Sequence, residues 1–129
     1  MYAHDHFGCF VDLSIDDFYN YIFGWSKEKV KKHYLNPHKL GLDFQKIYPE
    51  TKLDIGGRGY DWLQPLEDRN GNIISPKSYH PAVDVNDKRG GNSDFGQPIY
   101  APCNGEVIHE VRTWDSNFGW GNIIIIKED

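Results

Sequence analysis

A run of four isoleucines, Ile123 to Ile126, restricts the fold of this 129-residue chain more than any other feature. β-branched side chains favour extended structure, and a short unbroken apolar run is typical of a strand that is buried on both faces. We therefore expect a strand within Trp120–Glu128. Such a strand requires neighbours on both sides. Because this one ends close to Asp129, the sequence predicts a domain that is incomplete or is completed by another chain.

Shorter strands are predicted upstream of this run. Ala82–Asn86 and Gly105–Thr113 alternate apolar and polar residues, and Pro98–Ala101 is a short apolar segment. The connections between these segments consist of turn formers, Gly90-Gly91 among them. Strands at such short spacing, joined by tight turns, favour antiparallel β-structure.

The first part of the chain has helical patterns instead. Ser14 is placed to cap a helix whose apolar residues recur at steps of three and four as far as Ile22. Ser26 is placed to start a second short helix, which continues to Tyr34. We therefore predict a small helical region at residues 1–53. It is followed at residues 54–129 by the first part of a mainly β domain with an antiparallel sheet.

Composition excludes several classes of function. Nineteen acidic residues against fourteen basic ones give a net charge of −5, and no long basic tract is present, so we expect no nucleic-acid partner. The most basic segment, Lys27–Lys32, fits the solvated face of a helix. No apolar stretch reaches the ~18 residues that a transmembrane helix needs, and the N-terminal residues lack the pattern of a secretory signal. The compartment and the oligomeric state stay open.

Two cysteines, Cys9 and Cys103, are too few to define a disulfide framework, and their spacing is not that of a metal-binding knuckle. They could pair in an oxidising compartment, or they could be two unrelated buried thiols. The sequence leaves both interpretations open.

His80 and Asp84 are the strongest candidates for chemistry. Imidazole nitrogen and carboxylate oxygen are both good zinc ligands. On a straight strand, side chains four residues apart would be separated by about 13 Å, too far for one ion. A shared metal therefore requires the chain to bend at His80-Pro81 before it enters the strand. The alternative is a turn histidine and a surface aspartate without a metal.

The motifs around and after His80 come in an order that resembles the lysostaphin-type zinc endopeptidases, which cleave peptidoglycan. That family has a His-x-x-x-Asp motif, a Gly-x-Pro-Val-x-Ala strand, a Gly-x-Val strand and a Gly-x-Gly-Asn entry into an apolar strand. The corresponding segments here are HPAVD from His80, GQPIYA from Gly96, GEV from Gly105 and GWGN from Gly119. The resemblance covers about residues 79–128.

The resemblance implies that His80 and Asp84 are two of three zinc ligands. In the family the third ligand is the second histidine of a His-x-His motif far downstream. The first histidine of that motif and one in a Tyr-x-His segment assist catalysis. No histidine follows His109. We therefore expect a peptidase domain truncated before its third ligand and its catalytic histidines, and inactive alone. The family also implies a peptidoglycan peptide as partner and a cell-envelope or secreted location.

Both histidine motifs occur at the opposite end of the chain. Tyr2-Ala3-His4 is a Tyr-x-His, and His4-Asp5-His6 is a His-x-His. Residues two apart on a strand share a face, so His4 and His6 could bind one metal in a site rearranged within the chain or between chains. Chance placement in a terminal segment is the alternative. Aromatic side chains that could line a substrate groove, or could simply be core residues, are Tyr79, Trp114, Phe118 and Trp120.

Two other functions stay open beside the peptidase. Some relatives of the family have lost zinc ligands and serve as non-catalytic envelope-binding or hydrolase-regulating modules on the same scaffold. Ala101–Val107 also resembles a strand of biotinyl- and lipoyl-carrier domains. Those carriers need a lysine at a tight hairpin, and no lysine lies between Arg89 and Lys127.

Overall fold

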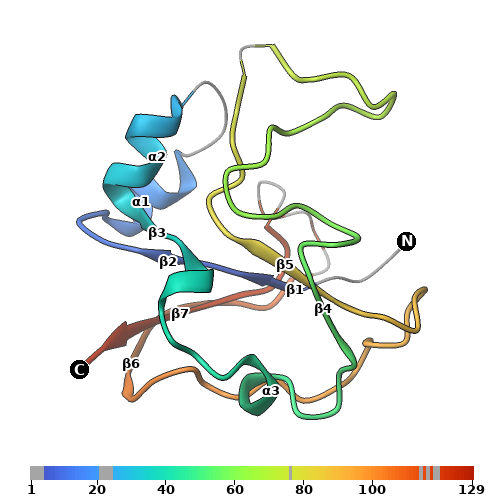
Figure 1. Ribbon diagram of the computed structural model, residues 1–129. Helices are drawn as coiled ribbons and strands as arrows, with labels where there is room; N and C mark the ends of the chain where they lie inside the picture. Colours follow the sequence, from blue (N-terminus) through green and yellow to red (C-terminus); the bar gives the residue numbers. More distant parts are fainter. Residues whose placement is uncertain (1–4, 21–24, 76, 114, 116, 118–119) are drawn as a thin grey trace.

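Short antiparallel strands predominate in the computed structural model of the chain, which describes residues 5–20, 25–75, 77–113, 115, 117 and 120–129 (Figure 1). More of these residues lie in strands than in helices, which confirms the predicted antiparallel β-structure in part, because the strands form small separate sheets mixed with three short helices. The strands are β1 (Asp5–Phe7), β2 (Cys9–Phe10), β3 (Tyr34–Leu35), β4 (Leu53–Ile55), β5 (Val83–Asp87), β6 (Gly105–Val111) and β7 (Ile123–Glu128). The helices are α1 (Ile15–Tyr19), α2 (Lys27–His33) and α3 (Phe44–Ile47), with a 3-10 turn η1 at Pro37–Lys39.

Strand β5 is the centre of a three-stranded antiparallel sheet in the order β1-β5-β4. It confirms the strand predicted at Ala82–Asn86, shifted by one residue. Its apolar side chains Val83 and Val85 are fully buried. The register pairs His6 of β1 with Asp84 of β5. The N-terminal segment is thus part of the same sheet as the middle of the chain.

Two clusters of buried side chains form the core on either side of Trp62. One contains Ile47, Tyr48, Val83 and Val85, and therefore joins α3 to the central sheet. The other contains Val30 and Tyr34, and joins α2 to the segment before β5. Trp62 packs against both clusters. The helical region consequently shares its core with the β-structure.

The predicted helix starts at Ser14 and Ser26 are confirmed. The Ser14 hydroxyl accepts a hydrogen bond from the amide of Asp17, and the Ser26 hydroxyl accepts one from the amide of Lys29. These bonds satisfy amides that have no partner within a helix. Helix α2 ends at His33, one residue before the predicted end. The predicted continuation of α1 beyond Asn20 lies outside the described residues.

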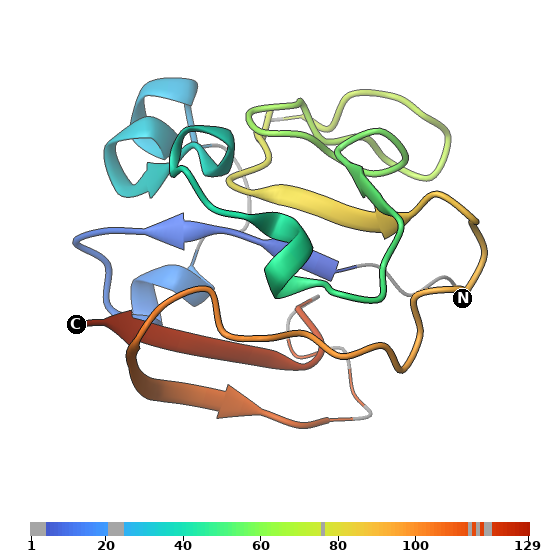
Figure 2. The ribbon, with the colours of Figure 1, turned by 60° about the horizontal axis from the view of Figure 1, so that its bottom comes forward.

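Strands β6 and β7 form a separate antiparallel hairpin, which lies below β1 in the view of Figure 2. Both strands were predicted, but the expected burial of the isoleucine strand on both faces is wrong. Ile125 is buried, whereas Ile124 on the other face is 66% exposed. Among the described residues this sheet has only two strands, and Ile124 faces solvent while Ile125 is covered.

The strand predicted at Pro98–Ala101 is absent from the described structure, where this segment is irregular. Pro98 has no amide hydrogen to donate to a ladder. The amide of Tyr100 donates instead to the carbonyl of Ile47 at the end of α3. The segment therefore runs across the molecule as a connection to β6.

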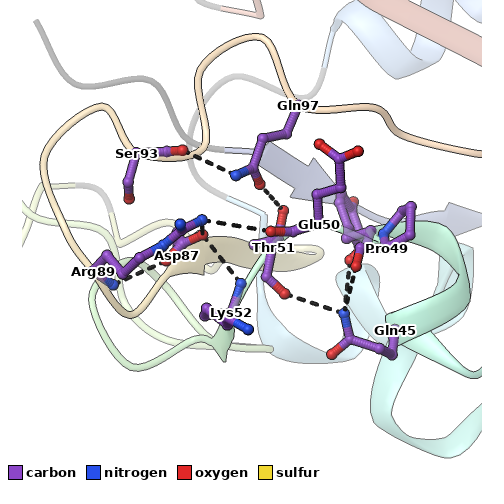
Figure 3. A network of polar contacts seen from close by, with 10 residues as sticks. Gln45, Pro49, Glu50, Thr51, Lys52, Asp87, Arg89, Ser93 and Gln97 are labelled. Carbon is purple, nitrogen blue, oxygen red and sulfur yellow. Dashed lines mark hydrogen bonds and ion pairs between the residues drawn. The ribbon is translucent and has the colours of Figure 1, made fainter.

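A polar network ties the end of β5 to the segment before β4 (Figure 3). The buried Asp87 carboxylate accepts hydrogen bonds from the guanidinium of Arg89 and from the amide of Lys52. Next to it, the Thr51 hydroxyl donates to the side-chain oxygen of Gln97. These bonds fix the loop after β5 against the body of the molecule.

Cys9 and Cys103 are both free thiols in this structure. Burial, together with the negative charges that Cys103 and Glu128 can carry, raises the pKa of Cys9 to about 11. Burial also raises the pKa of Cys103, so both thiols stay protonated at neutral pH. Within the described part of the chain, no helix has the length and apolar character needed to cross a membrane.

Candidate metal centre

The chain bends at Pro81 and Ala82, as a shared metal would require, before it enters β5. His80 precedes this bend, and both its backbone amide and its backbone carbonyl are hydrogen-bonded. Its amide donates to the carbonyl of Gln64, and its carbonyl accepts from the amide of Leu63. The bend brings His80 Nε2 to 3.3 Å from Asp84 Oδ1. The two residues predicted from the sequence are therefore adjacent in space.

Strand β1 adds a third candidate ligand, His6. Because His6 is paired directly with Asp84 across the β1–β5 ladder, its Nδ1 atom lies 3.4 Å from Asp84 Oδ1. The same atom lies 3.2 Å from His80 Nε2. Gly8 allows the chain after β1 to lie close to the start of β5, since a Cβ atom at residue 8 would lie 2.9 Å from the Cβ of Ala82.

His6, His80 and Asp84 thus present three ligand atoms in a nearly equilateral triangle. His80 and Asp84 are buried, while the side chain of His6 is 28% exposed. The triangle therefore has two buried members and one that is partly exposed to solvent. This arrangement can hold one cation and still admit a further ligand from outside.

The loop between β4 and the Trp62 region fixes the Asp84 carboxylate. The amide of Tyr60 donates to Asp84 Oδ2 at 2.8 Å, while Oδ1 faces the histidines. Gly59 makes this contact possible, because a Cβ atom there would lie 2.6 Å from both the Cβ and Oδ2 of Asp84. Oδ2 of Asp84 is therefore hydrogen-bonded to the backbone, while Oδ1 is the oxygen available to a metal.

Asp84 is negatively charged at neutral pH despite its burial. Burial opposes ionisation, but the hydrogen bonds that the carboxylate accepts from His6, His80 and the Tyr60 amide outweigh it and hold the pKa far below its ordinary value. The charge faces imidazoles, which balance it only when they are protonated. A bound cation would balance it at any pH at which the histidines are neutral.

His80 is oriented by packing. Its ring lies 5.6 Å from the ring of Tyr60 and 4.8 Å from the ring of His6, measured between centroids. Its Nδ1 atom is buried without a hydrogen-bond partner among the residues that the structure describes. A metal-binding histidine usually donates its second ring N–H to a neighbour. Here the rings of Tyr60 and His6 orient the His80 ring instead.

The four aromatic residues proposed for a substrate groove fall in different places. Trp120 lies beside the metal centre, with its ring 5.1 Å from that of His6. Tyr79 instead packs against the cluster around Val30, where the ammonium group of Lys27 lies over its ring. Trp114 and Phe118 lie outside the described residues, as does His4.

The remaining described histidines take part in other contacts. His38 is hydrogen-bonded to Asp61 at 2.6 Å, His109 to the hydroxyl of Tyr19 at 2.8 Å, and His33 packs against Trp25. Sequence reasoning did not place His6 with the pair His80 and Asp84. The His-x-His motif at residues 4–6 marked His6 as a possible ligand. The sequence did not indicate that β1 pairs with β5, which is what brings His6 to Asp84.

Comparison with models of known protein families, with curated proteins and with solved structures yields no match. The geometry of the metal centre and the motif order in the sequence are therefore the two features that point to a function.

Proposed function

We propose that this chain carries a mononuclear zinc site with His6, His80 and Asp84 as its protein ligands. We further propose that the site belongs to a hydrolase of the lysostaphin type, which cleaves the cross-link peptides of peptidoglycan. The observation that carries the zinc assignment is the size of the ligand triangle.

The three ligand atoms lie 3.2, 3.3 and 3.4 Å apart. Ligands bound at normal zinc distances with tetrahedral angles lie about 3.3–3.5 Å apart. An octahedral magnesium site requires a smaller spacing, about 2.8–3.0 Å, and prefers oxygen ligands. Two imidazole nitrogens and one carboxylate oxygen with this spacing therefore favour zinc. Three protein ligands with an open fourth position are typical of catalytic zinc sites.

The chain's own residues prepare the site for a cation. The Tyr60 amide holds Asp84 so that one oxygen is presented, and the exposed edge of His6 leaves an approach from solvent. When zinc is bound in such a site, it activates a water molecule for attack on an amide carbonyl and polarises that carbonyl. The peptidoglycan substrate is proposed from the motif order of residues 79–128.

The matching of motifs changes if His6 is the third ligand. His6 then corresponds to the second histidine of the His-x-His motif, and His4 corresponds to the first. In this arrangement the third ligand comes from the N-terminal end of the chain. It does not come from a segment after the isoleucine strand.

Metal analysis after dialysis against zinc tests the site. We expect about one zinc ion per chain, lost in His6→Ala, His80→Ala and Asp84→Asn. His38→Ala is the matched control, because His38 is also paired with an aspartate but lies outside the triangle. A wild-type protein without stoichiometric zinc would overturn the assignment. Full zinc affinity in His6→Ala would remove His6 from the ligand set.

Hydrolysis is tested separately with the zinc-loaded protein and cross-linked muropeptides. We expect His4→Ala to retain zinc while hydrolysis falls by about 10²- to 10⁴-fold, as for the loss of a group that assists proton transfer. Wild-type activity in His4→Ala would contradict the motif matching. If the zinc-loaded wild-type chain binds muropeptides without cleaving them, the non-catalytic module is the correct function.

A further inference from the structure

His6 is the least enclosed of the three candidate ligands. Its side chain is 28% exposed, against 7% for His80 and 4% for Asp84. It lies on β1, a strand of three residues at the edge of the sheet. Rotation of its imidazole about the Cβ–Cγ bond would carry Nδ1 away from the other two ligand atoms. A ligand in this position needs neighbours that restrict its ring.

Trp120 supplies such a neighbour from the turn before β7. Its ring lies 5.1 Å from the His6 ring at an angle of 83°, an edge-to-face arrangement. Trp120 is itself stacked on Phe18 of α1, with centroids 4.7 Å apart and an angle of 29°. Phe18 is buried. The three rings form a continuous series of contacts from buried Phe18 to the candidate metal ligand, with one stacked pair and one edge-to-face pair.

Polar contacts hold the turn that carries Trp120. The Trp120 amide donates to the carbonyl of Asn117, and the Asn117 side-chain amide donates to the carbonyl of Gly121. The same amide group donates to the hydroxyl of Tyr19 in α1, which is also hydrogen-bonded to His109 of β6. Helix α1 therefore anchors this turn both through the Phe18 ring and through the Tyr19 hydroxyl.

We propose that Trp120 is a positioning residue for the metal ligand His6, and that helix α1 holds Trp120 in place for this purpose. The proposal rests on the zinc site proposed above. It assigns the N-terminal region two contributions to one site, namely a ligand from β1 and the support of that ligand from α1. The turn before β7 completes the support.

The contact acts on metal affinity through the orientation of the His6 ring. Without the indole, the imidazole has more orientations to lose when the metal binds, so the affinity falls. Neighbours that orient a metal ligand commonly change affinity by about tenfold or more when they are removed. A phenyl ring keeps an edge-to-face contact and a stacking surface. Trp120→Phe is therefore expected to retain most of the effect.

The test uses the full chain and measures zinc affinity by competition with a chromophoric chelator. The visible absorption of bound Co²⁺ reports the coordination geometry. We expect Trp120→Ala to lower zinc affinity about tenfold and to alter the Co²⁺ spectrum, and Trp120→Phe to restore both nearly to wild type. Trp25→Ala is the matched control, because Trp25 packs against His33 outside the site. It should leave affinity and spectrum unchanged.

A double-mutant cycle separates positioning from general destabilisation. In a His6→Ala background, Trp120→Ala should have no further effect on the residual metal affinity. Wild-type affinity and spectrum in Trp120→Ala would overturn the proposal while leaving the zinc site intact. A wild-type chain that binds no zinc would overturn both. If circular dichroism shows Trp120→Ala to be unfolded, Trp120→Leu and Tyr19→Phe take its place, and unchanged affinity in both also overturns the proposal.

Discussion

Asp84 and Asp87 lie on one strand, are both buried, and keep their negative charges through different partners. Asp87 is paired with the guanidinium of Arg89, which carries a permanent positive charge. Asp84 faces His6 and His80, which are cations only when protonated. A buried charge without a permanent counter-charge is costly. Of the two carboxylates, Asp84 is therefore the one whose surroundings favour a bound cation, and Asp87 is a structural residue.

The pairing of Asp87 predicts a pH-dependent stability. Hydrogen bonds from Arg89 hold the pKa of Asp87 well below its ordinary value of 3.8. A depressed pKa in the folded state stabilises the protein above pH ~4, and this contribution is lost as the pH falls through the range below. We expect Asp87→Asn to lower the urea midpoint at pH 7. At pH 3 this deficit should be smaller by roughly a third, because only part of the stabilisation has been lost at that pH.

Urea titrations of wild type and variant at several pH values measure this difference. Asp61→Asn is the comparison, because Asp61 is paired with His38 at an exposed position, where ion pairs contribute little. Its deficit should be smaller at every pH. A deficit for Asp87→Asn that stays constant from pH 7 to pH 3 would contradict the role assigned to the Arg89 pair.

Among the helices and strands, the sequence predicts those features that depend on residues close together in the chain. The caps at Ser14 and Ser26, strand β5 and the bend at Pro81 each depend on residues a few positions apart. The placement of His6 depends on pairing between β1 and β5, which are far apart in sequence, and a three-residue strand has too few side chains to specify its partner. The isoleucine run predicts a strand, but its burial depends on how many layers cover it.

Gly59, in the loop before Trp62, lies against the Asp84 side chain. Gly59→Ala places a methyl group 2.6 Å from Oδ2 of Asp84, so the carboxylate or the loop must move and the Tyr60 hydrogen bond is disturbed. We expect zinc affinity to fall about 10- to 100-fold, as for other changes next to a metal ligand. Chelator competition on the folded variant measures the loss.

Gly41→Ala serves as the control for strain alone. Gly41 has a φ of +68° and open space around it, so alanine there is strained without touching the site. It should lower stability but leave the zinc affinity of the folded protein unchanged. Equal zinc affinity in Gly59→Ala and wild type would mean that Asp84 does not depend on close packing of this loop.

At the scale of the whole molecule, the candidate ligands join parts of the chain that are distant in sequence. His6 belongs to the N-terminal segment, whereas His80 and Asp84 flank the entry to the central strand, more than 70 residues later. The two hydrophobic clusters also span this division through Trp62. A metal bound at the triangle would therefore link β1 to β5 and favour the folded state of the whole chain.

This linkage predicts stabilisation by zinc. A metal that binds only the folded state at a free concentration 100 times its Kd adds about 2.7 kcal/mol to the free energy of unfolding. For a chain of this size the corresponding rise in Tm is on the order of 10 °C. Calorimetry with and without zinc should show this rise in wild type and in His38→Ala. A chelator should reverse it.

The ligand variants decide where the stabilisation originates. His80→Ala and His6→Ala should both lose the zinc-dependent rise in Tm, because each removes one corner of the triangle. If His6→Ala keeps the rise while His80→Ala loses it, zinc binds without the N-terminal strand and does not join β1 to β5. Loss in both variants, with β1 becoming protected from hydrogen exchange only when zinc is present in wild type, would establish that the metal fastens the N-terminal segment to the central sheet.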